Sequence, residues 1–117
     1  MTVAEELKAL GVHGILITAA EQGRIPKVAC QMPECLCPEE LGGREHFEAA
    51  QPPLTLWMPN LDHIGLQSAG GQRTLENVRL AHCVCNRVDF NKNQGIPYAK
   101  DLASVEEARR QAIEKKK

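Results

Sequence analysis

The chain has 117 residues and a formal net charge of −1, from 14 lysines and arginines against 15 aspartates and glutamates. This length suits one small domain rather than two. The aromatic residues are few, with one Trp, one Tyr and two Phe, so we expect a thin core that needs a disulfide or metal staple. No apolar run reaches the roughly 18 residues of a membrane span, and we expect no membrane association.

The N-terminal sequence MTVAEELKAL lacks a basic segment followed by an apolar stretch, so we expect no signal peptide and a cytoplasmic protein. Cytosolic proteins rarely keep disulfides, and the chain has five cysteines, an odd number. The cysteines therefore favour metal binding over a disulfide framework. Residues 1–61 carry a net charge of −4 and residues 62–117 a net charge of +3, which predicts a modest basic face on the second half.

The first third of the chain predicts one helix and then an ambiguous segment. Apolar spacing predicts a helix over 2–10, with Thr2 as its N-terminal cap and Gly11 at its end. The apolar stretch 14–17 fits either a strand or a buried helical turn, because periodicity cannot separate the two. Residues 38–53 are polar, contain paired glycines and prolines, and predict a loop.

The second half predicts two strands and two helices. Residues 54–58 have β character, and 78–80 form a candidate second strand. A helix is predicted over 83–92. Ser104 and Glu107 have the spacing of a capping box, which predicts the start of a final helix.

The chain carries two pairs of soft metal ligands, far apart in sequence: Cys30 and Cys35, then His82 and Cys85. Structural zinc takes four such ligands in a tetrahedron, commonly as two close pairs. The alternative is that the cysteines are buried core thiols. In the zinc interpretation Cys37 and Cys83 are spare thiols or alternative ligands.

A further pattern connects these pairs. It runs Asp62-His63-Ile64, Gly70-Gly71, Thr74-Leu75-Glu76-Asn77-Val78-Arg79-Leu80 and His82-x2-Cys85-Asn86-Arg87. This pattern resembles the HNH endonuclease motif, and Cys30 to Cys35 resembles the upstream knuckle of the zinc-containing HNH branch. The intervals of 14 positions from His63 to Asn77 and 9 from Asn77 to Asn86 also resemble that family.

The resemblance implies a ββα-metal core and a role for each matching residue. His63 matches the general base that activates water, and Asp62 matches a metal ligand. Asn86 matches the second metal ligand, and Asn77 matches the asparagine that orients the histidine. The structural zinc set is matched by Cys30, Cys35, His82 and Cys85. His82 stands where the family more often has cysteine.

These roles agree with the chemistry of phosphodiester hydrolysis. A histidine can take a proton from water. Oxygen ligands from Asp62 and Asn86 suit a hard divalent ion, so we expect Mg²⁺, Mn²⁺ or Ni²⁺ at the catalytic site and Zn²⁺ at the structural one. Two departures from the family pattern concern substrate contact: Gly65 where a proline is often found nearby, and Asp89 where a lysine is common.

The sequence thus predicts an α+β fold in three parts. We expect residues 1–29 to form a flanking segment with a helix plus a strand or turn. Residues 30–97 should form an HNH core stabilised by zinc, and 98–117 a C-terminal helix. We expect a metal-dependent DNA endonuclease acting on double-stranded DNA. Candidate phosphate contacts are Arg73, Arg79, Arg87 and Lys92.

The alternative function is a non-catalytic zinc module that binds DNA or a protein partner. The four residues matched to catalysis favour the enzyme, because a purely structural zinc module has no need of that set. The sequence leaves open whether the chain acts alone, as a homodimer, or within a larger phage or restriction assembly.

Overall fold

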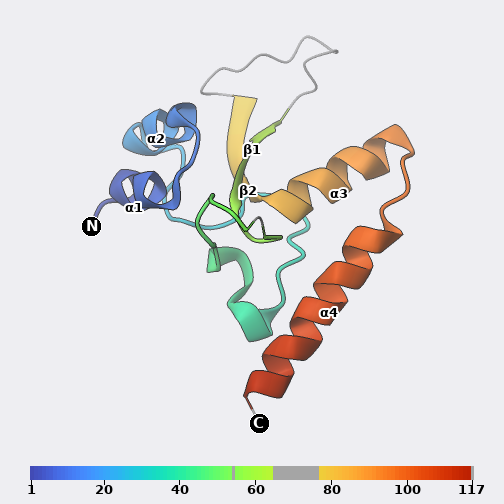
Figure 1. Ribbon diagram of the computed structural model, residues 1–117. Helices are drawn as coiled ribbons and strands as arrows, with labels where there is room; N and C mark the ends of the chain where they lie inside the picture. The colour runs from blue at the N-terminus through green and yellow to red at the C-terminus, as the bar shows by residue number, and fades with distance from the viewer. Residues whose placement is uncertain (54, 65–76, 117) are drawn as a thin grey trace.

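The computed structural model describes residues 1–53, 55–64 and 77–116 (Figure 1). Within them, the chain forms four α-helices and a two-stranded antiparallel sheet, so the fold class is α+β. In chain order the elements are α1 (Val3–Leu10), α2 (Gly14–Glu21), β1 (Pro59–His63), β2 (Val78–His82), α3 (Cys83–Gln94) and α4 (Ala99–Lys115). Two short 3₁₀ turns, η1 (Glu39–Leu41) and η2 (Gly43–Glu45), interrupt the long segment between α2 and β1.

The first helix has the caps that its sequence predicts. The Thr2 side chain accepts a hydrogen bond from the Glu5 backbone N–H, and Glu5 accepts one from the Thr2 backbone in return. Gly11 ends the helix in the left-handed region, with φ of 81°. The ambiguous segment 14–17 lies in a helix, α2, whose first turn is capped by the ring of His13.

The two strands pair directly, with Asp62 opposite Arg79 and His63 opposite Val78. The prediction of a strand over 54–58 was wrong for the described residues of that segment, since β1 begins at Pro59; residue 54 lies outside the described part. The carbonyls of Leu56 and Met58 instead accept hydrogen bonds from the backbone N–H groups of α3's first residues, at 3.1 and 2.9 Å. This segment therefore serves as a backbone cap for α3.

The last two helices follow β2 closely. α3 begins at Cys83, as predicted, and Gly95 ends it in the left-handed region, with φ of 70°. The predicted capping box at Ser104 was wrong, because α4 begins at Ala99. The Ser104 hydroxyl instead donates to the Lys100 carbonyl within the helix, at 3.1 Å.

The core divides into two clusters on either side of β2. One packs under α1 and α2 and includes Leu7, Leu16 and Leu80. The other surrounds Cys30 and Trp57 and reaches the inner face of α3. Figure 1 shows α1 and α2 on one side of the sheet and α3 on the other. No helix within the described ranges has the length and apolar character needed to cross a bilayer.

Candidate metal centre and adjoining cleft

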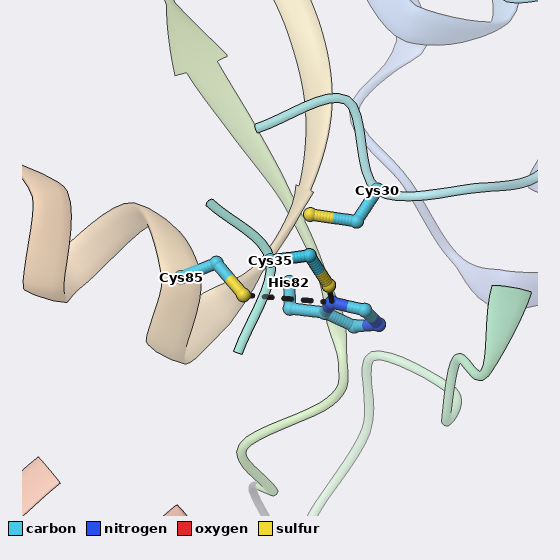
Figure 2. A group of neighbouring side chains, drawn as sticks. All are labelled: Cys30, Cys35, His82 and Cys85. Atoms are coloured by element: carbon cyan, nitrogen blue, oxygen red, sulfur yellow. Dashed lines mark hydrogen bonds between the residues drawn. The ribbon is translucent and has the colours of Figure 1, made fainter. Parts of the chain in front are cut away.

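Four side chains converge beside the end of β2: Cys30, Cys35, His82 and Cys85 (Figure 2). One ligand atom from each lies within 4.8 Å of all the others. Two come from the loop after α2, one is the last residue of β2, and one lies in the first turn of α3. The structure therefore brings the two distant ligand pairs into one cluster that could hold a metal such as zinc.

The distances within the cluster match a tetrahedral zinc site. Nδ1 of His82 lies 3.5 Å from Sγ of Cys35 and 3.6 Å from Sγ of Cys85. A tetrahedron with Zn–S bonds of about 2.3 Å and a Zn–N bond of about 2.0–2.1 Å has an N···S edge of about 3.6 Å. The two N···S distances therefore agree with the spacing of ligands around one ion.

The other side of the His82 ring fixes which nitrogen faces the cluster. Nε2 lies 2.5 Å from the backbone carbonyl oxygen of His46. A carbonyl only accepts, so Nε2 donates and Nδ1 is the nitrogen that faces the sulfur atoms and could bind a metal once its own proton is lost. Phe47 stacks on the ring at a centroid distance of 4.3 Å, and Trp57 meets its edge at 5.4 Å. The orientation of the His82 ring is therefore set by its surroundings.

Backbone and guanidinium groups support the cysteine ligands. The Leu36 backbone N–H donates to Sγ of Cys85 at 3.2 Å. Arg44 donates to the carbonyls of Cys30 and Pro33, each at 3.0 Å, and to that of Met32. One guanidinium thus ties together the loop that carries the first ligand pair. A site with three thiolates and one divalent ion has an overall charge of −1, and the Arg44 cation lies beside it.

The acid–base properties of the cluster follow from its internal hydrogen bonds. Bonds from Cys35 and then Cys85 lower the pKa of the Cys30 thiol, which favours a thiolate there. Bonding to Cys30 raises the pKa of Cys85 in turn. Burial alone would lower the pKa of His82, but hydrogen bonds with Cys30 and Cys35 outweigh it and raise the pKa to about 9. The hydrogen bonds therefore favour the thiolate at Cys30 and the protonated thiol at Cys85, so binding of a metal would have to displace protons from the cluster.

The remaining two cysteines lie outside the cluster. Burial, and then the charge of Cys35, raise the pKa of the Cys37 thiol to about 12. Cys83 is half-buried at the start of α3, and its Sγ accepts a hydrogen bond from Arg87 at 3.6 Å. Both agree with the interpretation of spare thiols.

A cleft of about 570 Å³ lies beside the same strand and helix. Asp62 and His63 enter it from the end of β1, and Asn86 enters it from the first turn of α3. The Asn86 amide donates to Oδ1 of Asn60 at 2.8 Å and to the Leu61 carbonyl at 3.4 Å. Because both bonds use its nitrogen, the amide oxygen is the atom of Asn86 that could contact a cation.

Asp62 is buried, with 6% of its surface exposed, and it has a cationic partner. Nε of Arg79 lies 2.6 Å from its Oδ2. Burial raises the pKa of Asp62, and the hydrogen bond and charge of Arg79 partly offset this rise. Arg79, predicted as a phosphate contact, is therefore engaged with the predicted metal ligand.

The other predicted residues lie around this cleft or outside it. The Asn77 carbonyl accepts from the Ile64 N–H at 2.8 Å, just beyond the paired strands. Arg87 donates twice to Oδ1 of Asp101, at 3.0 and 2.6 Å. Lys92 forms an ion pair with Glu34 at 3.7 Å. Residue 73, the remaining predicted phosphate contact, lies outside the described residues, as do the predicted turn glycines at 70 and 71.

Several neighbours of these sites were not foreseen. Arg44, Asn60 and Phe90 contact or line them, but each is an isolated residue with no spacing that marks it. His46 contributes through its backbone carbonyl, which any residue could supply. A search against protein-family models, curated proteins and solved structures found no match to this chain.

Proposed function

We propose that the chain is a metal-dependent DNA endonuclease of the HNH class. The observation that supports it best is the convergence of Asp62, His63 and Asn86 in one cleft at the junction of β1 and α3. A carboxylate, an imidazole and an amide oxygen are the groups needed to hold a hard divalent ion and to remove a proton from water. They come from segments more than 20 residues apart, so the chain itself brings them together by folding.

Each residue has a distinct task in this proposal. His63 accepts the proton of the attacking water. Asp62 and the amide oxygen of Asn86 would hold Mg²⁺, Mn²⁺ or Ni²⁺. When bound, such an ion neutralises charge on the scissile phosphate and the leaving oxygen. Asn60 keeps the Asn86 amide turned so that its oxygen, rather than its nitrogen, is available.

The cysteine–histidine cluster is proposed as a structural zinc site. Four protein ligands complete a tetrahedron and leave no position for substrate, which is typical of structural rather than catalytic zinc. The ligands join the loop after α2 to the end of β2 and the start of α3. Zinc there stabilises the same helix turn that carries Asn86.

Cleavage assays test the proposal directly. Supercoiled plasmid and circular single-stranded DNA are incubated with zinc-loaded protein in Mg²⁺, Mn²⁺ or Ni²⁺. We expect wild-type protein to nick at least one substrate and His63→Ala to lose at least about a hundredfold in rate. His13→Ala is the matched control, because His13 caps α2 and does not line the cleft. Equal, background-level cleavage by wild type and His63→Ala under all three ions would refute the proposal.

The second candidate is a zinc module that binds DNA or a protein without cleaving. The Asp62–Arg79 ion pair favours it, because the buried carboxylate already has a cation beside it. This candidate predicts DNA or protein binding with no metal-dependent cleavage. It also predicts that Mn²⁺ titration detects no divalent site besides the cysteine–histidine cluster.

A further inference from the structure

The cleft has an apolar wall next to its catalytic candidates. Phe90 and Ile64 both line it, with 50% and 57% of their surfaces exposed. Ile64 follows His63 directly, and Phe90 lies one helical turn after Asn86 on the same face of α3. Single exposed apolar side chains are ordinary on a protein surface, but these two line one cleft together with the proposed base. Together they suit a ligand with a flat apolar surface.

The charges of the cleft argue against a duplex as that ligand. Among the described residues that line it, the cations are Arg79 and Arg87, and each is bound to a carboxylate. Asp89 also lines the cleft and adds a negative charge that repels backbone phosphates. Duplex binding depends largely on cations that neutralise backbone phosphates. Few such cations are present among the described lining residues, so we expect contacts to the base to supply the larger share of the affinity.

An unpaired nucleotide fits both the exposed apolar wall of the cleft and its small number of cations. Its base can stack on an aromatic ring, which is how proteins hold single strands without reading their sequence. A paired base cannot do so, because its faces are covered by the neighbouring base pairs. Asn93, also in the cleft wall, adds an amide of the kind that hydrogen-bonds to base edges.

We propose that the cleft takes an unpaired nucleotide whose base stacks on Phe90, so that the substrate is single-stranded or locally unpaired DNA. This inference rests on the proposed endonuclease function. It replaces the duplex expected from the sequence with a strand that has at least one unstacked base next to the cleaved phosphate.

Binding assays with labelled oligonucleotides test the inference. A 20-nucleotide strand, its perfect duplex, and the same duplex with a four-nucleotide bulge are titrated with zinc-loaded protein in EDTA-free Ca²⁺ buffer and followed by fluorescence anisotropy. We expect the strand and the bulge to bind at least about tenfold more tightly than the duplex. Phe90→Ala should weaken strand binding about tenfold and leave duplex binding unchanged.

Two further variants separate stacking from folding. Phe90→Tyr keeps an aromatic face and should retain strand binding. Ile96→Ala removes another exposed apolar side chain that does not line the cleft and should also retain it. Zinc content and circular dichroism verify that every variant is folded. Equal or tighter binding to the duplex, or strand binding that is unchanged in Phe90→Ala, would overturn the inference.

Cleavage of the same three oligonucleotides in Mn²⁺ separates this inference from the proposed function. Preferential cutting of the strand or at the bulge supports both. Preferential cutting of the perfect duplex overturns the inference and leaves the endonuclease intact. If none of the three is cut and Phe90-dependent binding persists, the endonuclease proposal fails instead.

Discussion

Arg79 and Asp62 are direct cross-strand partners, and Nε of Arg79 lies 2.6 Å from Oδ2 of Asp62. The carboxylate is buried and the guanidinium is mostly buried. A buried charge left without its partner destabilises a fold far more than an exposed one. This pair therefore links the stability of the sheet to the charge state of the proposed metal ligand.

Arg79→Met should lower the free energy of unfolding by about 2–3 kcal/mol, measured by urea denaturation. The loss should grow with pH. Arg79 lowers the pKa of Asp62, so its removal raises that pKa further. The folded state then binds a proton more tightly than the unfolded state, and stability falls as pH rises from about 4 toward neutrality. The double variant Asp62→Asn with Arg79→Met should recover part of the loss.

An exposed ion pair provides the control for that experiment. Arg110 and Glu107 pair on the surface of α4, three residues apart. Arg110→Met should cost no more than about 0.5 kcal/mol, with little dependence on pH. A similar cost for both methionine variants would contradict the buried-pair explanation.

Cys30→Ser and Cys37→Ser form a matched pair for the metal site. Both cysteines are buried, but only Cys30 belongs to the ligand cluster. We expect about one zinc per chain in wild type and in Cys37→Ser, by elemental analysis. Cys30→Ser should lose the zinc and at least about 3 kcal/mol of stability, since metal binding contributes directly to folding. Normal zinc content in Cys30→Ser would remove it from the ligand set.

Thiol alkylation should distinguish the half-buried Cys83, the buried Cys37 and the three cysteines of the ligand cluster. The thiolate is the reactive form, and burial, followed by the charge of Cys35, raises the pKa of Cys37 to about 12. Zinc-loaded protein at pH 8.5 should therefore be labelled at Cys83, which is half-buried, and not at Cys37. A chelator should expose the three ligand thiols to labelling, which peptide mass spectrometry can locate. Labelling of Cys37 ahead of Cys83 would contradict this order.

Arg44→Gln should weaken zinc binding by about tenfold or more, measured by competition with a chromogenic chelator. Gln cannot reach the three carbonyls to which the guanidinium donates. The loop with Cys30 and Cys35 therefore loses the hydrogen bonds that hold its shape. Arg109→Gln is the control, because the ion-pair partners of Arg109 within the described part of the chain are Glu40 of η1 and Glu106 of α4, which are not in the ligand cluster. Unchanged affinity in Arg44→Gln would show that the loop holds its shape without the guanidinium.

Local signals in the sequence predicted local structure well. Thr2 and Gly11 bound α1 because caps depend on a few neighbouring residues. The four ligands of the cluster could be predicted from paired spacing alone, since each pair lies on one short segment. What spacing cannot predict is the support that reaches these ligands from elsewhere, such as the bond from Nε2 of His82 to the His46 carbonyl.

Some features could not be predicted because they depend on where a helix begins or on contacts between distant residues. The β character of 54–58 predicted a strand paired in the sheet. The carbonyls of Leu56 and Met58 instead cap the start of α3. The capping box predicted at Ser104 was wrong, because α4 had already begun at Ala99. Asp101 pairs with Arg87 across two helices, and no rule of sequence spacing marks that partnership.

Asn86 follows Cys85 directly, so one helical turn has a residue of the cysteine–histidine cluster on one side and a cleft residue on the other. Successive residues of an α-helix are rotated by about 100°. A single inserted or deleted residue between His82 and Asn86 would therefore turn one of the two groups away from its site. The number of residues from His82 to Asn86 therefore sets the orientation of both sites. We expect relatives of this chain to differ in the other side chains of this segment but not in its length.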